Sequence, residues 1–142
     1  MLTPGESPGF LLWHATLRWQ REVTAALAPL GLTHVQFVLL ACTWWLNSEG
    51  GHPNQQAVAR QAGTDVKMTS QVLRTLEAKG LLARETDPSD TRAKRLRVTE
   101  EGAALAPRAI AAVEAVDAAF FASAPRAETV GVLRALVGRE GG

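Results

Sequence analysis

Cysteine is nearly absent from this chain of 142 residues, and long apolar runs are absent altogether. The single cysteine, Cys42, excludes an intramolecular disulfide framework of the kind that stabilises small secreted proteins. The longest apolar run, residues 35–46, is interrupted by Gln36 and Thr43 and is shorter than the roughly 18 residues that a membrane span needs. The N-terminus also lacks the pattern of a secretory leader. We therefore expect a cytoplasmic protein with no membrane association.

Catalytic and metal-binding patterns are missing as well. The three histidines, His14, His34 and His52, lack the spacing of metal ligands, and Cys42 is the only thiol, which argues against a zinc site. No Ser/His/Asp set, glycine-rich phosphate loop or carboxylate pair is placed for catalysis. We therefore predict neither an enzyme nor a bound cofactor or metal. A catalyst stays open as an alternative, and turnover of a substrate would establish it.

The net charge is small, but the charges are unevenly distributed. The whole chain carries +1, with 15 Lys and Arg against 14 Asp and Glu. Residues 55–97 hold nine Lys and Arg against five Asp and Glu, whereas the rest of the chain holds six against nine. A basic middle between acidic ends is expected when one lobe of a protein meets the phosphates of a nucleic acid.

Apolar periodicity, caps and breakers divide the chain into helices joined by short loops. Residues 1–9 are rich in Pro, Gly and Ser and are expected to be flexible. The segment 34–46 is apolar nearly all round, which predicts a central buried helix. Residues 52–53 are expected to form a short strand. The remaining expected helices are 10–28, 55–61, 64 or 65 to 79, 100–121 and 126–139.

The two helices between residues 54 and 79 have the pattern of a helix-turn-helix, with Gly63 as the turn. In the second helix, polar residues recur at i, i+3, i+4 and i+7, which places them on one face. These residues are Lys67, Ser70, Gln71 and Arg74. Arg can bond guanine and Gln can bond adenine, so the face suits a major groove, although a merely solvated face is the alternative. Thr64 could add a phosphate contact at the helix start.

A basic β-hairpin follows this unit. Residues 82–86 lead in, Asp-Pro-Ser-Asp at 87–90 makes the turn, and residues 95–99 lead out. Arg92 at the tip suits a narrow minor groove, where Asp90 could hold its guanidinium. Lys94 or Arg95 is expected to contact a phosphate. Arg97 is expected to be partly structural, because alternate residues of a strand cannot all face DNA. The alternative is a hairpin that is merely solvated. Together with the helix-turn-helix, the hairpin predicts a winged helix that binds double-stranded DNA.

Three segments carry a resemblance to a known family. They are Leu-Glu-Ala-Lys-Gly-Leu-Leu-Ala-Arg at 76–84, Asp-Pro-Ser-Asp-Thr-Arg-Ala-Lys at 87–94 and Leu-Arg-Val-Thr-Glu-Glu-Gly at 96–102. With Gly-Leu-Thr-His-Val-Gln-Phe at 31–37, they resemble the MarR family of bacterial transcription regulators. The resemblance extends over about residues 10–140.

The resemblance implies a mostly α fold with a small β-hairpin wing, in which a winged helix-turn-helix at 32–99 is joined to a helical dimerisation region at 10–31 and 100–142. It implies a homodimer on a pseudo-palindromic operator, and a repressor that releases DNA when a small aromatic effector binds. Residue by residue, the recognition positions fall on Lys67, Ser70, Gln71 and Arg74, and the wing pair on Asp90 and Arg92. Independently, the terminal helices carry more apolar surface than a small winged core can cover.

Aromatic residues suggest where an effector would bind. Trp13, His14 and Trp44 are the candidates, because aromatic walls suit aromatic ligands; core and dimer packing is the alternative for each Trp. Cys42 lies in the most apolar helix, where a thiol usually serves packing, and a redox role is the alternative. For the whole chain, the alternative to a DNA-binding regulator is a winged-helix module that binds protein without specific DNA binding.

Overall fold

The computed structural model describes residues 1–138 as a helical chain with one antiparallel hairpin. Two 3-10 turns, η1 and η2, lie at Pro4–Glu6 and Ala28–Leu30. The helices and strands, in chain order, are α1 (Pro8–Leu27), α2 (His34–Ser48), α3 (Gln55–Ala62), α4 (Val66–Ala78), β1 (Leu82–Asp87), β2 (Asp90–Val98), α5 (Glu100–Phe120) and α6 (Arg126–Val137).

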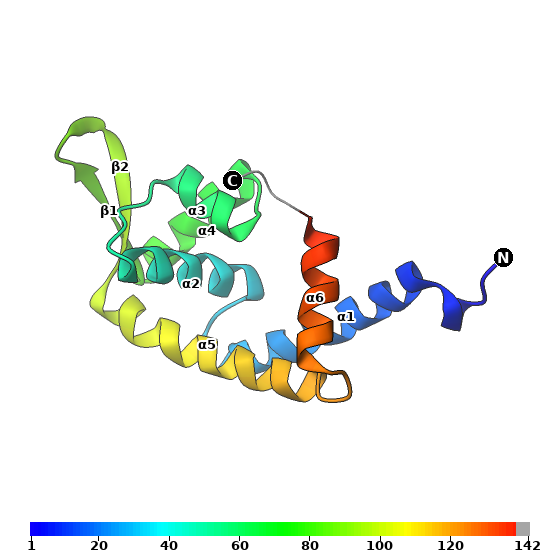
Figure 1. Ribbon diagram of the computed structural model, residues 1–142. Coiled ribbons are helices and arrows are strands. Elements are labelled where there is room, and N and C mark those ends of the chain that lie inside the picture. The colour runs from blue at the N-terminus through cyan, green and yellow to red at the C-terminus, as the bar shows by residue number, and fades with distance from the viewer. Residues whose placement is uncertain (139–142) are drawn as a thin grey trace.

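The hydrophobic core lies around α2, as the apolar segment 34–46 predicted. Leu39 and Leu40 of α2 are fully buried, and α2 packs against α1, α3, α4, α5 and β2. Figure 1 shows α3 and α4 on one side of α2 and the long helix α5 on the other. The hairpin projects from one end of this assembly, while α6 and the N-terminal half of α1 extend from the other.

A polar and aromatic cluster joins α1, α2 and α5 where they meet. Trp19 Nε1 donates a hydrogen bond of 2.8 Å to Asp117 Oδ1. The ring of His34 meets the Trp19 ring edge-on, with centroids 5.1 Å apart. Burial lowers the pKa of His34, and the nearby Asp117 charge partly opposes that shift. The helices that lead away from the core are thus tied to α2 by a mixed polar contact.

The start of α5 depends on one glycine. The hydroxyl of Thr99 caps the helix by accepting from Gly102 N at 3.1 Å, and it donates to Gly80 O at 2.6 Å. A Cβ at Gly102 would lie 2.1 Å from the carbonyl oxygen of Leu81, so only glycine fits this approach. The contact fixes α5 against the loop that joins α4 to the hairpin.

Several element boundaries differ from those predicted. α1 begins at Pro8, where Ser7 caps it, and η1 occupies part of the segment expected to be flexible. Residues 52–53 form no strand; Pro53 O accepts one hydrogen bond, of 2.8 Å, from Leu96 N, and Asn54 then caps α3. The predicted end of the last helix at Arg139, and the dimerisation limit at 142, lie outside the described residues.

Within residues 1–138, no single helix has both the length and the apolar character to cross a membrane. The pair Pro8–Leu30 and His34–Ser48, bent by 72°, meets that test by length and composition alone. The second of these two segments contains α2, whose side chains form the centre of the core.

Candidate nucleic-acid interface

The helix-turn-helix is held by the caps of α4. Gly63 adopts a positive φ of 72°, which a turn between the two helices requires and glycine allows. Asp65 then caps α4 by accepting from Met68 N at 2.8 Å. Thr69 is fully buried and donates to Asp65 O at 2.7 Å, which ties the first turn of the helix together. Helix α4 therefore starts at one defined residue.

Thr64 takes part in this turn, whereas the sequence suggested that it could contact a phosphate. Its backbone amide donates to Ala59 O at 3.1 Å. Its hydroxyl lies 2.6 Å from the hydroxyl of Thr69, and because Thr69 already donates to Asp65, Thr64 must be the donor in this pair. A phosphate only accepts hydrogen bonds, so the engaged donors of Thr64 argue against the predicted phosphate contact.

The exposed face of α4 is the one that the spacing of its polar residues indicated. Lys67, Gln71 and Arg74 are exposed, and Ser70 is half-buried beside them. On the opposite face, Leu73 and Leu76 are fully buried in the core. The apolar face thus fixes the helix while cations and amide groups remain free to meet a ligand.

The hairpin is longer than predicted and irregular at its tip. Asp87 pairs with Asp90 across the two-residue turn Pro88–Ser89, and Thr86 pairs with Lys94. Residues 91–93 therefore bulge from β2 without partners in β1. Arg92 lies in this bulge and is exposed. The bulge makes the tip protrude, which suits a side chain that must enter a groove.

The expected pairing of Asp90 with the Arg92 guanidinium is wrong in this structure. Asp90 Oδ1 instead accepts from the backbone N of Arg92 at 3.0 Å. The short side chain of Asp90 reaches the backbone amide two residues ahead, as in an Asx turn, more readily than it reaches a guanidinium at the end of a long side chain that points away. Asp90 therefore shapes the bulge, and the guanidinium stays available.

The other wing cations differ in their surroundings. Lys94 Nζ donates to Thr86 Oγ1 at 2.9 Å and remains exposed. Arg97 Nε lies 2.6 Å from Glu85 Oε1, which agrees with the partly structural role expected for Arg97. Arg95 is half-buried, and its buried Nε has no hydrogen-bond partner among the described residues. Lys94 and Arg95 thus retain donor capacity.

Asp87 prepares the turn that carries these cations. Hydrogen bonds from the hydroxyl and backbone N of Ser89, with a smaller contribution from the Arg95 charge, lower the pKa of the Asp87 carboxyl. The ionised Asp87 side chain thus stabilises the turn by accepting both hydrogen bonds from Ser89.

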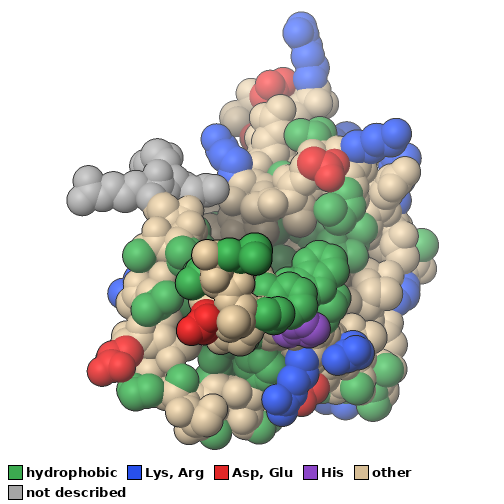
Figure 2. Space-filling model, turned by 90° about the vertical axis from the view of Figure 1, so that its right-hand side faces the viewer, with side chains coloured by type: hydrophobic (Ala, Val, Ile, Leu, Met, Phe, Trp, Pro, Cys, Tyr) green, Lys and Arg blue, Asp and Glu red, His purple; other side chains and the backbone are tan. Residues whose placement is uncertain are grey.

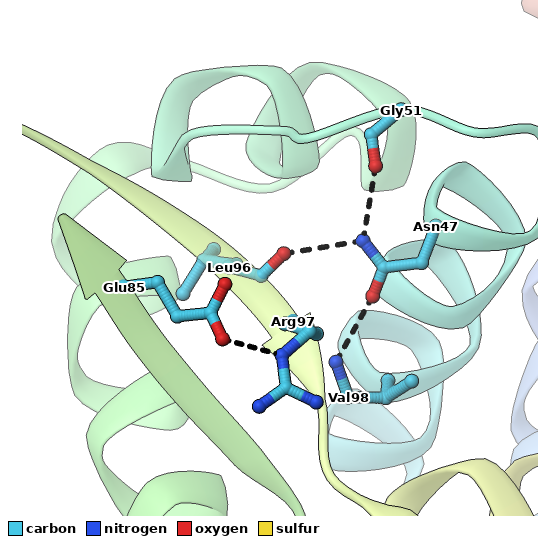
Figure 3. Close-up of polar contacts among 6 residues, drawn as sticks. All are labelled: Asn47, Gly51, Glu85, Leu96, Arg97 and Val98. Atoms are coloured by element: carbon cyan, nitrogen blue, oxygen red, sulfur yellow. Dashed lines mark hydrogen bonds and ion pairs between the residues drawn. The ribbon is translucent and has the colours of Figure 1, made fainter. Parts of the chain in front are cut away.

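Asn47 anchors the wing to the core, a role that the sequence did not reveal. Its Nδ2 donates to Leu96 O and to Gly51 O, both at 3.2 Å, and its Oδ1 accepts from Val98 N at 2.9 Å (Figure 3). With the Pro53 contact to Leu96 N, these bonds occupy the outer edge of β2 in place of a third strand. Asn47 directly follows the apolar segment 34–46 in sequence, where it has the character of a loop former, whereas the structure places it in the last turn of α2.

A second anchor joins the wing to both helices of the helix-turn-helix. Arg84 of β1 pairs with Glu77 of α4, and its Nη1 donates to Gln55 Oε1 of α3 at 3.4 Å. All three side chains are half-buried. The wing and α4 are therefore held in one arrangement by charged and polar contacts.

Comparisons with known proteins agree with this architecture. The MarR family model matches residues 32–94, which lie within the winged helix predicted at 32–99. An uncharacterised HTH-type transcriptional regulator of Bacillus subtilis, YdcH, is 46% identical over 125 residues, covering 88% of this chain and 85% of its own. The chain belongs to the MarR family. The HTH-type transcriptional repressor Rv2887 of Mycobacterium tuberculosis is 39% identical over 80% of this chain and 79% of its own.

Solved structures extend the match to three dimensions. The transcriptional repressor CouR, bound to a 23-mer DNA duplex, superposes with a TM-score of 0.79 at 28% identity and covers 96% of each chain. This member of the MarR family is accordingly a winged helix-turn-helix, DNA-binding transcriptional regulator. The prediction of fold and of regulator class is confirmed.

The residues suggested for an effector site lie in two separate places in the described part of the chain. Trp13 and His14 lie in the exposed N-terminal half of α1, where His14 meets the Phe10 ring at 4.5 Å between centroids. Trp44 packs against the core from α2. Burial raises the pKa of the Cys42 thiol, which disfavours the reactive thiolate and agrees with packing. No three His, Cys, Asp or Glu side chains in residues 1–138 are placed to hold a metal ion.

Proposed function

We propose that this MarR-family protein is a cytoplasmic, homodimeric, ligand-responsive repressor that binds a pseudo-palindromic operator. The recognition helix α4 would enter the major groove and the wing the adjacent minor groove. The observation that carries this assignment is the exposed polar face of α4, which Arg84 joins to a protruding basic hairpin. Asn47 ties the same hairpin to α2. Residues 32–99 would form the DNA-binding lobe, and 10–31 with 100–142 the dimerisation region.

The proposed DNA contacts fall into two groups with different roles. Gln71 and Arg74 would read base edges, with Lys67 and Ser70 beside them, because amide and guanidinium groups can each form paired hydrogen bonds with a base. Arg92, Lys94 and Arg95 would follow the backbone and the minor groove, where their charge supplies affinity with little sequence preference.

The dimer proposal rests on apolar surface that this chain leaves uncovered. None of the described residues of α6 is buried, although Leu133, Leu136 and Val137 lie along it. The N-terminal half of α1 is similar, with Trp13 61% exposed. Figure 2 shows hydrophobic side chains gathered on the face that carries these two segments. An isolated helix of this length is marginal in water, so a second copy is the natural cover.

An effector would bind near Trp13, His14 and Trp44, between the dimerisation helices and the DNA-binding lobe. Related structures support an aromatic ligand. CouR was solved with p-coumaroyl-CoA and Rv2887 with salicylic acid, both of which contain an aromatic ring. Binding would shift the population of dimers away from the lobe spacing that fits DNA.

Selection of genomic DNA fragments by the purified protein, near physiological salt, tests the proposal. We expect an inverted repeat whose half-sites are about one helical turn, or roughly 34 Å, apart. Gln71→Ala or Arg74→Ala should relax base preference within each half-site more than it weakens non-specific binding. Binding without sequence preference would reject the operator assignment and favour a protein-interaction module. A single, asymmetric site would reject the dimer.

A further inference from the structure

Two exposed apolar side chains stand at the start of the recognition helix without a partner. Val66 is 63% exposed and Met68 is 38% exposed. Among the described residues, the other large exposed hydrophobic side chains lie in residues 1–17, at Trp45 of α2, or in α6. Val66 and Met68 are therefore separate from the surface assigned to the dimer, and nothing in the winged core covers them.

Their position is the part of a recognition helix that reaches deepest into DNA. They occupy the first and third residues of α4, and N-terminal residues of such helices contact base edges in the major groove. Lys67 lies between them, and Gln71 and Arg74 follow on the exposed face. Because residues two apart in a helix point to different sides, Val66 and Met68 flank the exposed face that carries Lys67. Both side chains border DNA when that face enters the groove.

The major groove offers one apolar group for such side chains. The 5-methyl group of thymine projects there, whereas cytosine presents an amino donor and guanine presents acceptors. At the helix start, Asp65 accepts from the backbone amide of Met68, and its own carbonyl accepts from Thr69 N. The Met68 side chain can therefore contact a methyl group while the Met68 amide stays paired.

We propose that Val66 and Met68 read thymine methyl groups in each operator half-site. The inference rests on the proposed operator function and adds residues that determine specificity. Val66 is β-branched and has one strongly preferred rotamer in a helix, so its thymine should be required at one position. Met68 is flexible, so its contact should tolerate thymine at either of two neighbouring base pairs.

Replacement of thymine by deoxyuridine tests the proposal directly, because it removes only the methyl group and keeps base pairing. We would measure fluorescence anisotropy with a selected operator duplex in which each half-site thymine is replaced in turn. Burial of one methyl group corresponds to about a fourfold change in affinity, and the wild-type protein should lose that much at the contacted positions. Replacements outside the half-sites should have no effect.

Protein variants assign each methyl group to a side chain. Each alanine variant, Val66→Ala or Met68→Ala, should lose its sensitivity to the one methyl group that the replaced side chain contacts. At that position it should bind the thymine and deoxyuridine duplexes equally. At the position read by the other side chain, the fourfold loss should persist. Lys67→Ala is the matched control, because it should weaken binding to both duplexes by the same factor. Far-UV circular dichroism confirms that the variants keep their helices.

Three outcomes would overturn the proposal. Specific operator binding that is indifferent to every thymine methyl group would refute it while leaving the operator function intact. If both alanine variants still lost affinity at every contacted position when thymine is replaced by deoxyuridine, other residues would contact the methyl groups. Failure of the wild-type protein to prefer any sequence would instead refute the operator function, and this inference with it.

Discussion

Substitution of Asn47 tests the claim that one side chain of the core helix holds the wing. Asn47→Ala removes three hydrogen bonds, to Gly51 O, Leu96 O and Val98 N. A net value of about 1 kcal/mol for each bond, with some compensation by water at this half-buried site, predicts a loss of about 2–4 kcal/mol in the free energy of unfolding. Such a loss is large for a protein whose total stability is about 5–15 kcal/mol.

Urea unfolding followed by tryptophan fluorescence would measure the change, at one fixed protein concentration because a dimer unfolds in a concentration-dependent way. Ser48→Ala is the matched control. Its hydroxyl is exposed and donates only to Trp44 O of the same helix, so its removal should change stability by less than about 0.5 kcal/mol.

Asn47→Asp sharpens the test. The carboxylate still accepts from Val98 N, but it faces the carbonyl oxygens of Leu96 and Gly51 where the amide donated. This variant should therefore be no more stable than Asn47→Ala at neutral pH. A loss below about 0.5 kcal/mol for Asn47→Ala would refute the claim that this side chain replaces a strand at the edge of β2.

Four further changes address the wing, the core, the dimer and pH. Arg92→Ala should weaken operator binding and reduce the slope of log affinity against log salt by about one; an unchanged slope would remove the wing from the interface. Gly102→Ala should destabilise the fold by about 2 kcal/mol or more, since its Cβ would lie 2.1 Å from Leu81 O; an unchanged thermal midpoint would contradict this. Leu136→Asp should yield monomers in sedimentation velocity, and an intact dimer would exclude α6 from the interface. Burial lowers the pKa of His34, so stability should fall as pH drops below about 6.5; His34→Gln should flatten this decline relative to wild type, and identical pH profiles would refute the reasoning.

The sequence predicted the helices well because residues next to each helix determine where it starts. Thr33, Asn54, Asp65 and Thr99 each cap a helix through the side chain, at or within one residue of the predicted start. The two faces of α4 were equally predictable, because the spacing of buried and polar residues along one helix needs no knowledge of its partners.

The contacts of Asn47 that position the wing could not be predicted, because they join it to strand residues far away in the chain. Asn47 bonds Val98 across 51 positions, and nothing near Asn47 distinguishes it from an ordinary loop residue. The prediction that Asp90 holds the Arg92 guanidinium was wrong for another reason. Charge alone favours the Arg92 guanidinium, whereas the backbone of the bulge brings an amide within reach first.

The anchored wing limits how an effector of the proposed kind could act. Arg84 ties β1 to α3 and α4, and Asn47 with Pro53 ties β2 to the end of α2 and the loop beyond it. Helix α4 and the wing are thus one body, and altering their relative position would require several polar contacts to break together. Far fewer contacts hold α6 and the N-terminal half of α1, whose described residues remain largely exposed. Release of DNA should therefore come from a change in the spacing of two intact DNA-binding lobes, set by the dimerisation helices, and not from rearrangement within a lobe.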